Sequence, residues 1–208
     1  MTDMHGRGPT KVYDEAYFDR WYRSPRHRVS TDDQVARRVR MVVAAAEYAL
    51  GRPLRSALDV GCGEAPWRAH LRRARPRLAY LGVDSSEYVV RRYGRRRNIR
   101  LGTFGELGTL SSLRRRFDLV VCSDVMQYVP TAELRRGLAA LRGLLVGVAY
   151  FDVFSTADDV SGDKRGWHDR SPRLYRQLFA EAGLRPVGLH LYLTEKLAAD
   201  RAALEMAD

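Results

Sequence analysis

Residues 57–71 read ALDVGCGEAPWRAHL, and they begin with an apolar run, residues 57–60, that predicts a buried parallel strand. Two glycines, Gly61 and Gly63, follow at once, and then comes a segment that can begin a helix. A strand that passes through glycines into a helix N-terminus brings backbone N–H groups close to a ligand. We therefore expect a ligand site at the carboxyl end of this strand, with a tight glycine turn that binds nothing as the plain alternative.

Two kinds of dinucleotide fold compete for this stretch. A nicotinamide-binding loop has the pattern Gly-x-Gly-x-x-Gly, and Ala65 or Pro66 stands where its third glycine is needed. Asp59, two positions before the first glycine, suits the other kind. Residues 59–64, DVGCGE, resemble the first motif of the Rossmann-like (class I) S-adenosylmethionine-dependent methyltransferases. This resemblance implies that the methionine part of S-adenosylmethionine is held by Asp59, Gly61, Cys62 and Gly63, with the acid near its ammonium group.

A second acid follows at the spacing that the same fold needs. Residues 79–84, AYLGVD, predict a second strand that ends in Asp84, 21 positions after Gly63. A carboxylate there is placed to accept two hydrogen bonds from a ribose diol. A helix start, SSE at residues 85–87, comes next. Asp84 and Ser85 are therefore assigned to the ribose side of the cofactor.

Two further segments complete the resemblance. Residues 98–103 predict a short third strand that leads into GTFGE at 102–106. Thr103 stands where the family often has an acid, and the resemblance places Thr103 and Phe104 at the adenine edge. Residues 117–123, FDLVVCS, predict a fourth strand, and with DVMQYVP at 124–130 they resemble the fourth motif of the family. That motif borders the methyl group, so the resemblance puts Ser123, Asp124 and Met126 near the sulfonium.

The alternation of strands and helices predicts an α/β fold with a doubly wound, mainly parallel sheet of six or seven strands. Residues 144–154 and 184–193 are expected as the fifth and sixth strands, whereas 194–208 look helical where the family adds an antiparallel seventh strand. We expect residues 1–56 to form an N-terminal helical cap or extension and residues 57–208 to form one compact methyltransferase core.

The N-terminal residues are rich in aromatic side chains. Tyr13, Tyr17 and Trp21 share one stripe of a helix expected over residues 12–22, after a frayed tail at 1–12. The stripe either packs on the domain or covers cofactor and substrate. A capping box at residues 31–34 and Gly51 delimit the next helix.

The acceptor is expected to be a small, partly aromatic or apolar molecule. Its expected contacts are aromatic, namely Tyr17, Trp21, Tyr128, Tyr150 and Trp167. His168 follows the fifth strand and is the predicted general base for a hydroxyl acceptor, because its ordinary pKa suits proton removal at neutral pH. Asp124 or Asp152 could act instead, and an exposed loop histidine is the plainer interpretation.

Composition leaves two other functions open. The chain has 208 residues and a formal net charge of +11, and all but three of its 36 basic residues are arginines. Such charge suits an RNA methyltransferase, although GC-rich coding produces the same bias. The alternative outside the enzymes is a non-catalytic protein that binds the cofactor and acts as the partner of another enzyme. The sequence shows no metal-ligand spacing, and it predicts two free cysteines, a cytoplasmic location, no membrane segment and an oligomeric state that stays open.

Overall fold

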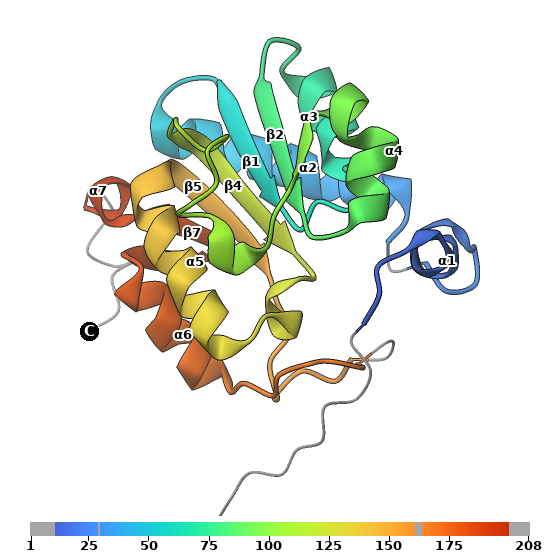
Figure 1. The fold of residues 1–208 in the computed structure, drawn as a ribbon. Coiled ribbons are helices and arrows are strands. Elements are labelled where there is room, and N and C mark those ends of the chain that lie inside the picture. The colour runs from blue at the N-terminus through green and yellow to red at the C-terminus, as the bar shows by residue number, and fades with distance from the viewer. Residues whose placement is uncertain (1–10, 29, 161–163, 200–208) are drawn as a thin grey trace, which may run out of the picture.

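The computed structural model describes residues 11–28, 30–160 and 164–199. One sheet of seven strands forms the centre of the molecule, in the order β3-β2-β1-β4-β5-β7-β6 (Figure 1). The strands are β1 Ser56–Val60, β2 Ala79–Asp84, β3 Ile99–Leu101, β4 Phe117–Ser123, β5 Leu145–Asp152, β6 Leu184–Gly188 and β7 Leu191–Thr194. Neighbouring strands from β3 to β5 are parallel, and β7 runs antiparallel to both β5 and β6. The expectation of a doubly wound, mainly parallel sheet is confirmed.

Helices cover both faces of this sheet (Figure 1). One face packs against α2 Asp32–Leu50, α3 Pro66–Ala74 and α4 Glu87–Arg97, and the other packs against α5 Thr131–Leu144 and α6 Pro172–Glu181. Each face has its own apolar cluster, because alternate side chains of a strand point to opposite faces. The loops that follow β1, β2, β3 and β4 therefore meet at one edge of the sheet, where an α/β fold binds its ligands.

The helix boundaries that the sequence predicts are largely confirmed. Thr31 and Gln34 form a complete capping box at the start of α2, and Gly51 ends that helix in the left-handed conformation (φ 64°). Ser86 and Ser171 cap α4 and α6 through their hydroxyl groups. α5 begins at Thr131, after Pro130, without a side-chain cap, and it continues through Gly143 to Leu144.

The prediction of a single sixth strand over residues 184–193 is wrong. The chain reverses at Leu189 and His190, whose φ angles are 52° and 62°, so that β6 and β7 form an antiparallel hairpin. Two successive residues with positive φ match the right-handed twist of a hairpin, but this turn usually carries Asn-Gly, so a Leu-His pair gives no signal. The seventh strand lies between β5 and β6, and only a short α7 follows, Glu195–Ala198, while residues 200–208 lie outside the described part.

The N-terminal helix is shorter than predicted. After Asp14, which caps it, α1 spans Glu15–Phe18 and continues as a π-helical turn over Asp19–Arg23. The wider π turn rotates Trp21 away from the stripe of Tyr13 and Tyr17, whose rings meet edge to face at 5.0 Å. Trp21 packs near the ring of His27 instead, at 6.2 Å. Of the tail predicted at 1–12, residues 1–10 lie outside the described residues.

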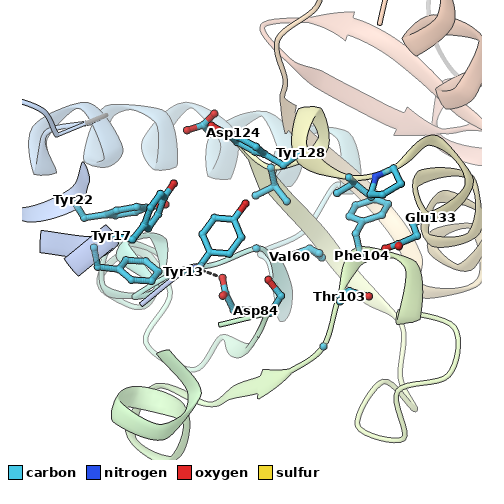
Figure 2. A pocket seen from close by; sticks show the side chains of 18 residues that line it. Tyr13, Tyr17, Tyr22, Val60, Asp84, Thr103, Phe104, Asp124, Tyr128 and Glu133 are labelled. Atoms are coloured by element: carbon cyan, nitrogen blue, oxygen red, sulfur yellow. Dashed lines mark hydrogen bonds between the residues drawn. The ribbon is translucent and has the colours of Figure 1, made fainter. Parts of the chain in front are cut away.

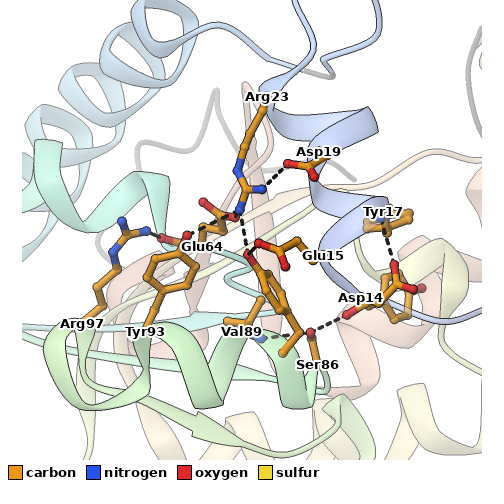
Figure 3. Close-up of polar contacts among 12 residues, drawn as sticks. Asp14, Glu15, Tyr17, Asp19, Arg23, Glu64, Ser86, Val89, Tyr93 and Arg97 are labelled. Carbon is orange, nitrogen blue, oxygen red and sulfur yellow. Dashed lines mark hydrogen bonds and ion pairs between the residues drawn. The ribbon is translucent and has the colours of Figure 1, made fainter.

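Polar contacts join this N-terminal segment to the core (Figure 3). Ser86 Oγ donates to the carbonyl oxygen of Tyr13 at 2.5 Å, and Arg23 pairs with Asp19 and with Glu64 of the loop after β1. The Arg23 guanidinium also donates to the hydroxyl of Tyr88 on α4 at 2.9 Å. The segment therefore docks across the same sheet edge that carries the glycine loop. Within the described part of the chain, no helix combines the length and apolar character needed to span a membrane.

Candidate functional site

Two cavities open at the carboxyl edge of the sheet, and they are in contact with each other. The smaller one has a volume of about 180 Å³ and the larger one about 630 Å³. Both are lined by the same five residues where they meet, namely Tyr17, Tyr22, Gly61, Asp124 and Tyr128. A ligand bound in one cavity is thus placed to reach a ligand bound in the other.

The smaller cavity is built around Asp84, at the end of β2 (Figure 2). One carboxylate oxygen accepts from the backbone N–H of Gly63 at 2.7 Å, and the other accepts from that of Ser86 at 2.8 Å. Each oxygen keeps further accepting capacity, since a carboxylate has about four lone-pair sites. The side chain is 8% exposed, and burial raises its pKa. Asp84 thereby ties the glycine loop to β2 and can still receive donors from the cavity.

The glycine loop has a backbone that other residues could not adopt without strain. Gly61 has a φ of 68°, and a Cβ there would lie 2.3 Å from Cγ2 of Val125. The N–H groups of Gly61 and Cys62 both donate to the carbonyl oxygen of Val83. The N–H group of Gly63 donates to Asp84, so all three loop N–H groups are bonded within the chain. The expectation was that these N–H groups face a ligand. The loop offers its close backbone surface and the nearby carboxylates instead.

Asp59 is the first of these carboxylates, and it lines the larger cavity. It is 3% exposed, and within the described residues its carboxylate accepts one hydrogen bond, from the hydroxyl of Tyr80 at 2.8 Å. Burial raises the pKa of Asp59 to about 7; the Tyr80 bond opposes this shift and the charge of Asp84 adds to it. A buried carboxylate in this condition is stabilised by any cation that comes near it.

A second pair of acids stands at the ends of β4 and β5. Asp124 has a left-handed backbone (φ 59°), and its N–H donates to the carbonyl oxygen of Asp152 at 2.8 Å. Burial, followed by the charge of Asp152, raises the pKa of Asp124 to about 6. The Asp152 carboxylate accepts from Ser123 Oγ at 3.2 Å and lies 3.8 Å from the guanidinium of Arg38 on α2. The larger cavity thus has an acidic floor.

The loop that carries Asp124 is held from below by Arg170, which is only 2% exposed. Its guanidinium donates to the carbonyl oxygens of Met126, at 3.0 Å, and Val129. It also donates to Thr131 Oγ1 at 3.1 Å and to the hydroxyl of Tyr175 at 3.2 Å. The buried charge is compensated by carbonyl and hydroxyl oxygens, and the loop conformation therefore depends on this one side chain.

Most of the predicted site residues come together at the two cavities. The smaller cavity is lined by Gly61, Gly63, Asp84, Ser85, Thr103, Phe104 and Asp124, among others. The larger cavity is lined by Asp59, Gly61, Cys62, Ser123 and Asp124, and also by the predicted acceptor contacts Tyr17, Trp21, Tyr128 and Trp167. The spacing of strand ends along the chain was therefore sufficient to find them.

Three predicted residues line neither cavity. Met126 is fully buried in the apolar cluster below the loop, and Tyr150 is buried with its ring 5.0 Å from that of Trp67. Tyr150 shares a face of β5 with Asp152, and it is Asp152, at the strand end, that reaches the cavity. His168 is exposed, and its backbone N–H donates to the carbonyl oxygen of Gln127 at 2.8 Å. Burial of part of the imidazole ring and the charge of Arg170 lower the pKa of His168.

Several lining residues were not predicted for the site. Tyr13 and Tyr22 reach the smaller cavity from the N-terminal segment, with the Tyr13 ring between Asp84 and Tyr128 (Figure 2). Glu133, on the first turn of α5, also lines this cavity. Arg38 lines the larger one from α2. The aromatic crowding of residues 13–22 was a sequence signal for the two tyrosines. A single charged residue on a surface helix, such as Glu133 or Arg38, gives no sequence signal that it lines a cavity.

The described residues form neither a metal-binding cluster nor a site with a reactive thiol. No group of three or more His, Cys, Asp or Glu side chains there is placed to hold a metal ion. Cys62 and Cys122 are both buried and free, and burial raises the pKa of each thiol well above its ordinary value. Neither is placed to act as a reactive thiolate.

Comparison with known proteins identifies a methyltransferase domain in part of the chain. Residues 58–147 match the model of a methyltransferase domain. No curated protein matches the sequence.

Solved structures share the fold at low sequence identity. The sugar N-methyltransferase KedS8 from Streptoalloteichus sp. is 22% identical with a TM-score of 0.63, over 93% of this chain and 96% of that one. DesVI from Streptomyces venezuelae is 16% identical with a TM-score of 0.60, over 76% and 90%. Magnesium protoporphyrin IX methyltransferase from Synechocystis, solved with S-adenosylmethionine bound, is 19% identical with a TM-score of 0.59, over 88% and 93%. Residues 58–147 thus match a methyltransferase domain, and the sheet order and these structures show that the chain has the Rossmann-like fold of the class I S-adenosylmethionine-dependent methyltransferases.

Proposed function

We propose that the chain transfers a methyl group from S-adenosylmethionine to a small molecule bound in the larger cavity. The observation that carries this proposal is the pair of connected cavities, one of about 180 Å³ and one of about 630 Å³, which meet at Asp124 and Tyr128. The larger volume is in the range of small-ligand pockets. Methyl transfer is an in-line displacement, so holding two ligands end to end supplies much of the acceleration.

The residues at the strand ends fit the cofactor. The smaller cavity would take the adenosine, with Asp84 and Ser85 at the ribose and Thr103 and Phe104 at the adenine. Glu133 adds an acceptor there for the adenine amine, at a cavity whose usual acid is replaced by Thr103. When bound, S-adenosylmethionine supplies an activated methyl carbon on a sulfonium.

The methionine end would lie where the two cavities meet and run into the larger one. Asp59 suits its ammonium group because the carboxylate is buried and its neutral state is favoured until a cation is near. Gly61, Cys62 and Gly63 give the close backbone surface, and Ser123 and Asp124 border the sulfonium side.

The N-terminal residues would act as a cap over both ligands. Tyr17 and Tyr22 line both cavities, and Trp21 lines the larger one. Their docking through Arg23 and Tyr13 supports this role, since these contacts join residues before α2 to the loop after β1 and to α4 (Figure 3). In this view residues 1–56 are an extension that completes the site of the 57–208 core.

Proton removal from the acceptor is better supported for the acids than for His168. Asp124 and Asp152 line the larger cavity, and His168 does not. The pKa of Asp124, about 6, is close enough to neutrality for a carboxylate to accept a proton.

An RNA acceptor is the runner-up, and only the net charge of +11 favours it. On α4 and α5, Arg97 lines the larger cavity, whereas the other arginines are exposed and line neither cavity, namely Arg91, Arg92, Arg95, Arg96, Arg135, Arg136 and Arg142. High salt should leave turnover nearly unchanged for a small neutral acceptor. A steep linear fall of log affinity with log salt, measured on an RNA ligand, would favour the runner-up.

Calorimetry with S-adenosylmethionine and with its demethylated product, followed by turnover on a pool of small metabolites, tests the proposal. We expect both ligands to bind and a methylated small molecule to form. Binding without turnover on any acceptor would support a non-catalytic cofactor-binding partner, and absence of binding would reject both functions.

A further inference from the structure

One of the three lysines of the chain has its ammonium group buried against the site. The Nζ atom of Lys11 lies 3.9 Å from the ring centre of Tyr128, 5.1 Å from that of Tyr17 and 5.6 Å from that of Tyr13. Its charge also acts on Asp124, whose pKa it lowers. A buried ammonium is costly unless its surroundings compensate for lost water, and aromatic faces beside a carboxylate do so. The chain itself thus reveals a subsite for a cation.

This subsite stands where the two cavities meet. Tyr17, Tyr128 and Asp124 line both of them (Figure 2). Two cations could therefore use it during methyl transfer. One is the sulfonium of S-adenosylmethionine, and the other is an ammonium group on the acceptor.

The direction in which positive charge moves during methyl transfer favours the acceptor amine, rather than the sulfonium, as the group that binds in this subsite. Positive charge leaves sulfur as the methyl moves, and with an amine acceptor it appears on nitrogen. A carboxylate beside that nitrogen interacts more strongly in the transition state than in the ground state, whereas the same carboxylate beside sulfur would stabilise the reactant. Asp124 is held in a left-handed conformation, which costs free energy and recurs at functional sites, and Asp152 and Ser123 extend the polar floor into the larger cavity.

We propose that the acceptor is an aliphatic amine whose nitrogen binds between Tyr17, Tyr128 and Asp124, in the subsite where the Lys11 ammonium lies. The inference rests on the proposed function and specifies its acceptor class. An amine that arrives protonated gives one proton to water and becomes neutral, while the Asp124 carboxylate stays ionised. Its nitrogen lone pair then forms the bond to the methyl carbon while the sulfur–carbon bond breaks, and that electron pair remains on the sulfur of the neutral thioether product. The N-methylammonium product carries the positive charge beside the ionised Asp124 and then leaves.

The first test measures binding with defined probes. Lys11→Met, loaded with S-adenosylhomocysteine, is titrated with n-hexylamine and with 1-hexanol at pH 7 in a calorimeter. We expect the amine to bind at least about tenfold more tightly than the alcohol, and more tightly than it binds the unmodified chain, because the competing ammonium is gone. Equal affinities for the two probes would overturn the inference, and an amine affinity that Lys11→Met leaves unchanged would overturn the place given to Lys11.

The second test separates the acceptor amine from the sulfonium. Tyr128→Leu removes an aromatic face, and Tyr128→Phe keeps it. Tyr48→Leu, at a tyrosine of α2 that is 91% exposed, is the matched control. We expect Tyr128→Leu to weaken amine binding about tenfold and to leave the ratio of S-adenosylmethionine to S-adenosylhomocysteine affinities unchanged. A ratio that falls towards one, with amine binding intact, would assign the subsite to the sulfonium and overturn the inference.

The third test follows the methyl group. Asp124→Asn is compared with Asp33→Asn, whose carboxylate is 72% exposed on α2, using labelled S-adenosylmethionine and matched amines and alcohols. We expect label on amines, with turnover reduced about a hundredfold by Asp124→Asn alone. Label on alcohols only would overturn the inference while leaving the proposed function in place. If neither cofactor form bound to the unmodified chain, the proposed function itself would fail.

Discussion

Cofactor affinity should depend on pH through Asp59. Burial raises the pKa of this carboxyl to about 7, and the proposed ligand brings an ammonium that needs the ionised form. The ionised fraction is then about 0.1 at pH 6 and about 0.9 at pH 8. We therefore expect the affinity for S-adenosylmethionine to fall about tenfold from pH 8 to pH 6, which corresponds to about 1.4 kcal/mol.

Calorimetry in two buffers of different ionisation enthalpy measures this effect directly. Binding at pH 7 should release about half a proton, because the ligand's charge converts the protonated fraction of Asp59 into the carboxylate. Asp59→Asn keeps an oxygen that can accept from Tyr80 and should remove this proton release, and the titration of the ligand's own amine is common to both proteins. Asp124, with a pKa of about 6, titrates in the same window, so Asp124→Asn serves as a second reference.

Tyr80→Phe sharpens the test. The hydroxyl of Tyr80 donates to Asp59 and lowers its pKa, so its removal should move the midpoint of the pH dependence above pH 7. An affinity that is constant between pH 6 and pH 8, with the same heat in both buffers, would refute the reasoning that places the ligand ammonium at Asp59.

The same carboxyl affects stability, and three other changes test the site. Because the pKa of Asp59 is raised on folding, its contribution to stability is fully present below about pH 4 and is lost as the pH rises through 7. Without ligand, Asp59→Asn should therefore melt at a higher temperature than the unmodified chain at pH 8, and at the same temperature at pH 4. Asp84→Ala should weaken S-adenosylmethionine binding about ten- to a hundredfold by removing charge-assisted bonds of roughly 1.5–3 kcal/mol; unchanged affinity in a folded variant would show that this acid does not hold the ribose. Arg170→Met leaves the carbonyl oxygens of the loop at 126–131 without their donor and should lower the free energy of unfolding by about 3 kcal/mol in denaturant titrations, whereas an effect below about 1 kcal/mol would show that water replaces the guanidinium. His168→Ala should keep turnover within about threefold, since the ring lines neither cavity, and a loss of about a hundredfold or more would return the base role to His168.

Local patterns in the chain were enough to predict the sheet edge and many of the residues that line the two cavities. Each parallel strand is an apolar run, and a polar residue or glycine that follows it lies at the carboxyl edge whatever the helices between the strands contain. Asp59, Asp84 and Asp124 could be placed at the site for this reason. Helix starts such as Thr31 and Ser171 were also predictable, because a cap satisfies backbone groups within one turn.

Contacts between distant segments decided the rest. Tyr150 and Asp152 carry the same strand pattern and are both buried, and only the packing of Trp67 against β5 shows that Tyr150 lies in the core whereas Asp152 reaches the cavity. The π turn at Asp19–Arg23 and the reversal at Leu189 and His190 have no sequence signal, since docking and sheet pairing outweigh local preference there.

The charge state of the site also required the tertiary structure. A carboxyl pKa depends on burial and on neighbours from other elements, as the Tyr80 hydroxyl beside Asp59 and the Asp152 charge beside Asp124 show. The position of Lys11 depends in the same way on Tyr128, which lies more than a hundred residues further along the chain. The sequence by itself determined which residues end the strands, and folding determined which charges those residues face, because electrostatic energy depends on distance in space rather than along the chain.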